Sequence, residues 1–248
     1  MEERRRTRMR AQHRHEKRWT QLWVTSVIRL NVQFMRVEFN YGQANFDSHG
    51  FDDVLVLSFP NEFVHPSSMP DELTSETFEL REYTVLFVDR QRRTVTVDFL
   101  LHEAGIATQW ARQAAPGQFL WCIPPRMCKS FAEAARTYIF SDPSALPAVR
   151  RFHEEAGDTP GQTVLVGLTT SLEPPVFTGP REVSVFERPL HATQLIAATD
   201  IAQSCSMESA FIWISGEAQW VGRMRRVLVK DFGVGKENIQ FTGYWRAD

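Results

Sequence analysis

The chain has 248 residues, of which 43% are hydrophobic and 12% aromatic, and its formal net charge at pH 7 is -2. This composition supports one large or two modest folded domains. It excludes an intrinsically disordered chain and an overall electrostatic attraction to nucleic acid or anionic membranes. The three cysteines (Cys122, Cys128 and Cys205) form no C-x-x-C pair, which argues against a disulfide framework, a thiolate zinc site and an iron–sulfur cluster.

The first eighteen residues are more basic than the remainder. They hold eight Arg or Lys residues against three Glu residues, a local charge of +5, so the remaining residues carry -7. No apolar segment follows, so they are not a secretory signal, and no apolar run approaches the ~18–20 residues that cross a membrane. We interpret residues 1–19 as a solvated basic leader, with an arm for nucleic-acid or membrane phosphates as the alternative. We expect a cytoplasmic protein.

Residues 20–126 are predicted to form an antiparallel β domain. Five segments are rich in β-branched and aromatic residues: Val24–Ile28, Val32–Phe39, Val54–Phe59, Tyr83–Val88 and Thr94–Leu101. Alternation of apolar and polar residues in several of them is typical of half-buried strands. Strands at this spacing predict a small barrel of the Greek-key type, interrupted by one helix at roughly Ile106–Gln113.

The periodicity changes after Arg126, and we place the domain boundary there. Three short apolar strands are predicted, at Thr137–Ser141, Thr163–Leu168 and Ala210–Ile214. Asp142 and Ser144 are N-cap residue types that open a helix, and a second helix follows Gly216-Glu217 and ends near Asp231. Strands that alternate with helices predict a parallel α/β sheet for residues 127–248.

An arginine, an aromatic ring and a hydroxyl stand close together in Arg81-Glu82-Tyr83-Thr84. On a strand, Arg81 and Tyr83 share one face and Thr84 points to the other. An arginine fork can clamp a pyrophosphate, a tyrosine ring can stack on an isoalloxazine, and a threonine hydroxyl can bond the flavin N5 edge. The same four residues also suit an ordinary amphipathic strand.

Further segments follow this one in a definite order. They are Asp98–His102, the turn and helix from Glu103 to Ala111, Ser141–Ala148, Trp213–Ala218 and Gly243-Tyr244-Trp245-Arg246. The series runs from about Val24 to Arg246. It resembles the siderophore-interacting proteins, which are FAD-containing ferric-siderophore reductases of the ferredoxin-reductase-like superfamily.

The resemblance implies non-covalent FAD bound to the barrel domain. The cofactor contacts that it implies are Arg81, Tyr83, Thr84, Leu101, His102, Gly105, Ala107, Thr108 and Trp110. Of these, Tyr83 and Thr84 are the expected catalytic residues, through their contact with the flavin. Small residues at a helix N-terminus let backbone N–H groups reach a diphosphate. Ile106 stands where the family commonly has proline, a departure that leaves the backbone donors unchanged.

The resemblance also implies a nicotinamide side and a substrate side. On the nicotinamide side we expect Asp142, Ser144, Gly216, Glu217 and Trp245. The absence of G-x-G-x-x-G does not weigh against NAD(P)H, because the superfamily does not use that motif. A core position is the favoured interpretation of Trp213. Arg126 and Arg246 match two positions of a basic cluster for anionic ferric siderophores, whereas Val56 stands where a lysine is often found.

The implied function is FAD-dependent reduction of Fe(III) to Fe(II) in imported ferric siderophores, with electrons from NADH, NADPH or ferredoxin. We expect a monomer without a resident metal or a nucleic-acid or membrane partner. Two alternatives stay open. One is a general NAD(P)H–flavin or ferredoxin-type reductase on the same scaffold, and the other is a non-catalytic module that binds a siderophore or flavin without turnover.

Overall fold

The structure is a computed structural model that describes residues 12–14, 18–60, 78–102, 105–129, 134–167, 181–187, 191–197, 199–203 and 210–247. The expected leader, residues 1–19, lies outside this part except for 12–14 and 18–19, and so do Cys205 and Glu103-Ala104. The chain forms two compact units, Ala11–Ser130 and Phe131–Asp248. The domain limits that we drew from the sequence stay a prediction.

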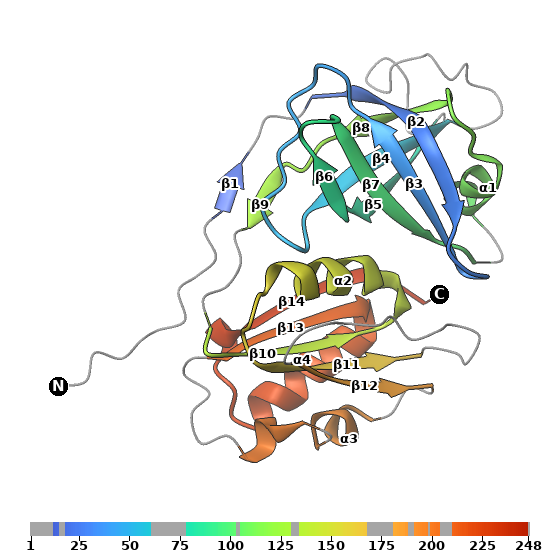
Figure 1. The fold of residues 1–248 in the computed structure, drawn as a ribbon. Coiled ribbons are helices and arrows are strands. Elements are labelled where there is room, and N and C mark those ends of the chain that lie inside the picture. Colours follow the sequence, from blue (N-terminus) through green and yellow to red (C-terminus); the bar gives the residue numbers. More distant parts are fainter. Residues whose placement is uncertain are drawn as a thin grey trace. The chain divides into compact units, whose positions relative to one another are not determined.

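The first unit is built on a seven-stranded antiparallel sheet, in the order β5-β4-β8-β2-β3-β7-β6. The strands are β2 Thr20–Arg29, β3 Phe34–Asn40, β4 Val54–Pro60, β5 Phe78–Thr84, β6 Phe87–Asp89, β7 Thr94–Leu100 and β8 Phe119–Ile123. The sheet curls into an open barrel beside helix α1 Ile106–Gln113 (Figure 1). A separate antiparallel pair joins β1 Gln12–Arg14 to β9 Met127–Lys129. The expected antiparallel barrel with one helix is confirmed.

Apolar side chains that alternate along the strands fill the barrel. Val37 and Phe39 of β3 lie opposite Val97 and Val95 of β7, and all four side chains are buried. Because successive strand residues point to opposite faces, this alternation sends one set inward and leaves the polar set outside. Each such side chain contributes roughly 1.5–3 kcal/mol through burial.

The single strand expected over Tyr83–Val88 is wrong. Strand β5 ends at Thr84 and β6 begins at Phe87, with a corner between them. The Val85 N–H donates to the Asp53 carbonyl just before β4 (2.9 Å), whereas the Leu86 N–H donates to the Thr96 carbonyl of β7 (3.0 Å). The chain therefore leaves its pairing with β4 and joins β7 within two residues. Both corner side chains are fully buried, which explains why the segment has the apolar character of a strand.

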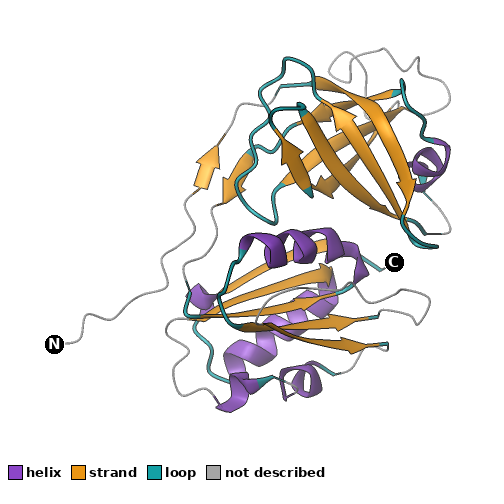
Figure 2. Ribbon diagram, in the orientation of Figure 1, coloured by secondary structure: helices purple, strands orange, loops and turns teal. Residues whose placement is uncertain are grey.

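The second unit is a parallel five-stranded sheet in the order β12-β11-β10-β13-β14. Its strands are β10 Arg136–Ser141, β11 Gly161–Val166, β12 Arg181–Phe186, β13 Ala210–Glu217 and β14 Ile239–Trp245. Its helices are α2 Leu146–Glu155, α3 Ala192–Ala197 and α4 Ala218–Lys230, with short 3-10 turns at Pro143–Ala145, Asp200–Gln203 and Lys236–Asn238. Helix α2 covers one face of the sheet and α3 and α4 cover the other (Figure 2). The expected parallel α/β sheet is confirmed.

Strand β13, which lies between β10 and β14, is buried along almost its whole length, as its unbroken apolar sequence predicts. Trp213 has no exposed surface, so its interpretation as a core residue is confirmed. None of the helices in the described ranges is long and apolar enough to cross a membrane.

Helix α2 carries a buried histidine on the side that faces the sheet. His153 is 7% exposed, and its Nε2 lies 2.9 Å from the Thr163 hydroxyl of β11. Burial, together with the positive charge of Arg181, lowers the pKa of His153 from 6.5 to about 4. The folded protein therefore holds this ring neutral at pH values where the unfolded chain protonates it.

We expect the free energy of unfolding to fall as the pH decreases from about 6.5 to about 4. In this range His153 binds a proton in the unfolded state but stays neutral in the folded state. Above this window both states are neutral and the effect vanishes. The shift corresponds to as much as about 3 kcal/mol. Urea unfolding at several pH values checks it. His153→Gln should flatten this part of the profile, whereas the exposed His191→Gln should not. Superimposable profiles for all three proteins would contradict the assignment.

Candidate functional site

Strand β5 carries the arginine, tyrosine and threonine that the sequence singles out. It is an edge strand, and Arg81, Tyr83 and Thr84 lie opposite Leu57, Leu55 and Val54 of β4. The Arg81 side chain is exposed, donates to the Leu80 carbonyl (2.9 Å) and forms an ion pair with Glu79. Exposed pairs of this kind contribute only about 0–1 kcal/mol. The guanidinium is therefore free to exchange Glu79 for a phosphate.

The Tyr83 ring lies at the margin of the barrel core. Its centroid is 4.5 Å from the ring of Phe99 and 6.3 Å from that of Phe59. Burial raises the pKa of the Tyr83 hydroxyl well above its usual range, and the charge of Arg81 opposes this only in part. The phenol therefore stays protonated, and the half-buried ring is a rigid aromatic surface. Thr84, on the opposite face of β5, is 4% exposed.

Helix α1 is held against the same aromatic group. The Trp110 ring lies 5.9 Å from Phe59, 5.6 Å from Phe99 and 6.0 Å from Phe39, centroid to centroid. Tyr83 and Trp110 thus share two aromatic neighbours, which fixes β5 and α1 relative to one another. Leu101, just ahead of the helix, is buried, and its N–H donates to the Gln33 carbonyl (2.7 Å).

The turn before α1 depends on a glycine. Gly105 is the N-cap residue with φ 125°, and a Cβ at this position would lie 2.8 Å from His102 Cε1. The N-cap residue makes no side-chain cap, so among the described residues no cap side chain competes for the N–H groups of the first turn. The Thr108 hydroxyl is turned back and accepts from the His102 N–H (3.4 Å). Ala107 and Thr108 are both buried.

These features fit a flavin dinucleotide. An uncapped helix N-terminus behind a side-chain-free glycine suits a diphosphate, since its N–H groups and the helix dipole both favour anions. Arg81 adds an exposed positive charge, and Tyr83 adds a half-buried ring. The structure thus brings Tyr83 and Trp110 together on one aromatic group, and His102, Gly105 and Thr108 together in one turn.

In the second unit, the Asp142 carboxylate joins three segments. Its Oδ1 accepts from the Ser144 N–H (2.8 Å) and the Ser144 hydroxyl. Its Oδ2 accepts from the Glu217 N–H (2.8 Å) and from Nε1 of Trp245 (2.9 Å). One side chain therefore ties the end of β10 to the start of α4 and to the end of β14.

Glu217 caps helix α4 with its own carboxylate. Its two oxygens accept from the backbone N–H groups of Gln219 (2.9 Å) and Trp220 (2.7 Å). These bonds, the one from Gln219 foremost, lower the pKa of Glu217. The preceding Gly216 has φ 139°, and a Cβ there would lie 2.4 Å from Asp142 Oδ2. The helix can start this close to Asp142 only because Gly216 has no side chain.

These residues stand at the switch point of the sheet. The chain continues from the central strand β10 to β11 and β12 on one side, whereas β13 and β14 lie on the other. Open α/β sheets bind ligands at the carboxyl ends of the strands where the order reverses. Asp142 and Glu217 stand at the carboxyl ends of β10 and β13, on either side of this point. The arrangement suits a dinucleotide at this edge.

Gly243 belongs to this site, although the sequence analysis gave it no role beyond its place in the Gly243–Arg246 segment. A Cβ on it would lie 3.0 Å from the Cβ of Ala218, the first residue of α4. The two small residues let β14 pass close to the helix and bring Trp245 within reach of Asp142. Apart from the place of Gly243 in that segment, the sequence signal was the presence of small residues at both positions.

The two expected substrate arginines lie in different units. Arg126 stands between β8 and β9, and Arg246 follows β14. Both are exposed, and neither forms an ion pair with any residue that the structure describes. Their common role at one substrate stays a prediction. The described residues also hold no group of three or more His, Cys, Asp or Glu side chains that suits a metal ion.

Comparison with known proteins covers both units. One family model, described as the siderophore-interacting FAD-binding domain, matches residues 23–128, and another, described as siderophore-interacting protein, matches residues 134–248. An NADPH-dependent ferric-chelate reductase from Escherichia coli (strain K12) is 29% identical over 250 residues, which cover 94% of this chain and 95% of that protein.

Solved structures also align with nearly the whole chain. A siderophore utilization protein from T. fusca aligns with a TM-score of 0.81 and 27% identity over 96% of both chains. A ferredoxin NADP+ reductase from Neisseria gonorrhoeae, solved with bound FAD and NADP, aligns with a TM-score of 0.64 and 11% identity. That alignment covers 93% of this chain and 100% of the reductase. At this identity, the likeness to the reductase shows the fold.

We expect Gly216→Ala to destabilise the protein by at least about 2 kcal/mol, because alanine is strained at this φ and its Cβ would collide with the Asp142 carboxylate. Thermal unfolding measures the loss. The matched control is Gly222→Ala in α4, where an added Cβ meets nothing within 4 Å. It should stabilise the helix by roughly 0.5–1 kcal/mol. Equal melting temperatures for the two variants would show that Asp142 does not lie against Gly216.

Proposed function

We propose, from the premise that this chain belongs to the siderophore-interacting protein family, that it is an FAD-dependent ferric-siderophore reductase. The reaction reduces Fe(III) to Fe(II) in the ferric complex, which releases the iron. The E. coli relative, which the chain matches over nearly its full length, carries the same class of activity in its name. The supporting observation in the structure is a barrel that fits a flavin dinucleotide, in one chain with a parallel sheet whose switch point fits a nicotinamide.

The residues of the barrel hold and orient the cofactor. Arg81 and the first turn of α1 would bind the diphosphate, Tyr83 would support the isoalloxazine, and Thr84 would serve its N5 edge. The chemistry that FAD supplies when bound is the acceptance of a hydride and the release of single electrons to Fe(III). The chain accordingly needs no nucleophile or acid–base pair.

The residues of the parallel sheet serve the electron donor. Asp142 holds Ser144, Glu217 and Trp245 in fixed positions around the switch point, where NAD(P)H binds. We propose NADPH as the donor because the E. coli relative is named for it, with reduced ferredoxin as the competing donor. We further propose that the protein acts as a monomer in the cytoplasm, where reduced nicotinamides are supplied.

Absorbance spectra of the purified protein test this function. The protein should be yellow, and anaerobic NADPH should bleach the flavin band. Addition of a ferric siderophore should restore the band while an Fe(II) chelator develops colour. Parallel runs with NADH and reduced ferredoxin identify the donor. A protein that stays colourless with added FAD overturns the proposal. A flavin that NADPH reduces but no ferric siderophore reoxidises indicates the general reductase instead.

Arg81→Ala should raise the dissociation constant of FAD about 10- to 100-fold, because a hydrogen bond to a charged group contributes ~1.5–3 kcal/mol. Fluorescence titration of the apoprotein with FAD measures this constant. Arg92→Ala is the matched control, since Arg92 is also an exposed arginine of the barrel paired with a glutamate, Glu38. Equal FAD affinities in the two variants would remove Arg81 from the cofactor site.

Tyr83→Ala and Thr84→Ala should affect the flavin differently, the first its retention and the second its rate of reduction. Loss of the Tyr83 ring should release FAD. Thr84→Ala should keep FAD but slow its reduction by NADPH in stopped-flow measurements. If both variants lose only thermal stability and to the same extent, the two residues are ordinary parts of the barrel.

Arg126→Ala and Arg246→Ala should each raise the half-saturating concentration of an anionic ferric siderophore and leave the FAD content unchanged. The effect should shrink with added salt, since exposed charges are screened over a Debye length of ~8 Å at physiological ionic strength. A neutral siderophore should respond less. The exposed Arg90→Ala, in the same unit as Arg126, is the control. Unchanged concentration dependence at low salt would make both arginines ordinary surface charges.

A further inference from the structure

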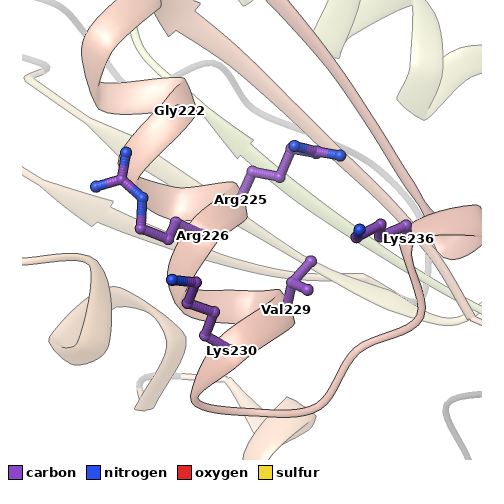
Figure 3. A pocket seen from close by; sticks show the side chains of 6 residues that line it. All are labelled: Gly222, Arg225, Arg226, Val229, Lys230 and Lys236. Atoms are coloured by element: carbon purple, nitrogen blue, oxygen red, sulfur yellow. The ribbon is translucent and has the colours of Figure 1, made fainter.

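One face of helix α4 carries a concentration of positive charge that the proposed reaction does not use. Gly222, Arg225, Arg226, Val229 and Lys230 recur at helical spacing and share one side of the helix. Together with Lys236, from the 3-10 turn that follows, they line a cavity of about 410 Å³ (Figure 3). Small-molecule sites in proteins have volumes of roughly 300–1,000 Å³. The cavity is thus large enough for a small ligand.

Nothing in the lining balances this charge. Four of its six residues are cationic and none is acidic. None of the four forms an ion pair with the acidic residues that the structure describes. The protein as a whole carries a net charge of -2, so the cluster does not reflect a general excess of basic residues. Like charges at this density repel one another, and a bound anion would relieve the repulsion.

Arg225 is held in place and has an unused donor. Its guanidinium lies over the ring of Phe241 on β14, with Cζ 4.8 Å from the ring centroid. Its Nε is buried and has no hydrogen-bond partner in the described part of the chain. The contact with Phe241 therefore holds a positive charge at the wall of the cavity.

The cavity lies at a distance from the nicotinamide site. Helix α4 begins at Ala218 beside Asp142 and runs away from the carboxyl ends of the strands. At 1.5 Å per residue, Arg225 lies ~10 Å and Lys230 ~18 Å along the axis from that start. The cluster therefore belongs to the far half of the helix.

We propose that this cavity is a binding site for a small phosphate-bearing anion of the size of a diphosphate. A phosphate group carries up to about two negative charges and three acceptor oxygens, and so matches several neighbouring cations better than a carboxylate does. The arginine forks of Arg225 and Arg226 supply directional donors, and Lys230 and Lys236 supply point charges. The aliphatic stems and Val229 form the apolar remainder of the wall. The site is independent of the proposed reductase function.

Calorimetric titration of the FAD-loaded protein with inorganic pyrophosphate at low salt tests the proposal. The wild type should show one saturable site that persists in excess NADP+. Arg226→Gln and Lys236→Gln should each weaken binding about tenfold or more, since each removes a charged hydrogen-bond donor. The double variant should bind no pyrophosphate. Arg223→Gln, which removes an exposed charge from the same helix outside the lining, should bind within about twofold of the wild type.

Three results would overturn the proposal. The first is the absence of saturable pyrophosphate binding to the wild type. The second is an affinity in the double variant equal to that of the wild type, or complete competition by NADP+, either of which places the anion elsewhere. The third is binding of citrate as tight as that of pyrophosphate, which would show a general attraction of polyanions. Melting temperatures of the variants confirm that each is folded.

Discussion

The Asp142 carboxylate is the interaction around which the carboxyl edge of the parallel sheet is organised. It accepts hydrogen bonds from Ser144, from the Glu217 backbone and from the Trp245 indole, so both of its oxygens are occupied. Bonds to a charged acceptor are about twice as strong as bonds between neutral groups. Gly216 and Gly243 are needed because the segments that deliver these donors approach very closely.

In the barrel, apolar contacts position the residues of the candidate cofactor site. Tyr83 and Trp110 pack on the same two rings, Phe59 and Phe99, so the strand and the helix that bear the cofactor residues are positioned by the core itself. The polar groups, Arg81 and His102, stand outside this packing and remain exposed. Packed rings with exposed polar groups beside them are a suitable support for a flavin, whose ring needs fixed orientation and whose phosphates need donors.

Helix α4 carries a capped N-terminus at one end and the cationic cavity toward the other. Its N-terminus is capped by Glu217 and its last turn carries Lys230, and both charges are favourable to the helix dipole. This effect accounts for Lys230 alone. Arg225 and Arg226 stand about a turn earlier, and Lys236 lies beyond the helix, so the dipole does not explain their gathering around one cavity. Because the helix dipole does not account for these three cations, their clustering supports an anion site at the cavity.

The sequence by itself determined those features whose signals are local. The limits of α1, the N-cap at Asp142 and the buried parallel strand before α4 follow from hydrophobic periods of two or 3.6 residues and from capping residue types. The choice of Arg81, Tyr83 and Thr84 rested on a strand pattern together with the order of later segments.

Only the tertiary structure decided how distant segments meet. The apolar run from Tyr83 to Val88 turned out to be a corner, because Val85 and Leu86 pair with different strands. The bond between Asp142 and Trp245 joins residues 103 positions apart, and the α4 cavity needs Lys236 from outside the helix. Periodicity reports which face of an element is buried. It carries no information on which remote partner covers that face, since this depends on the packing of the whole unit.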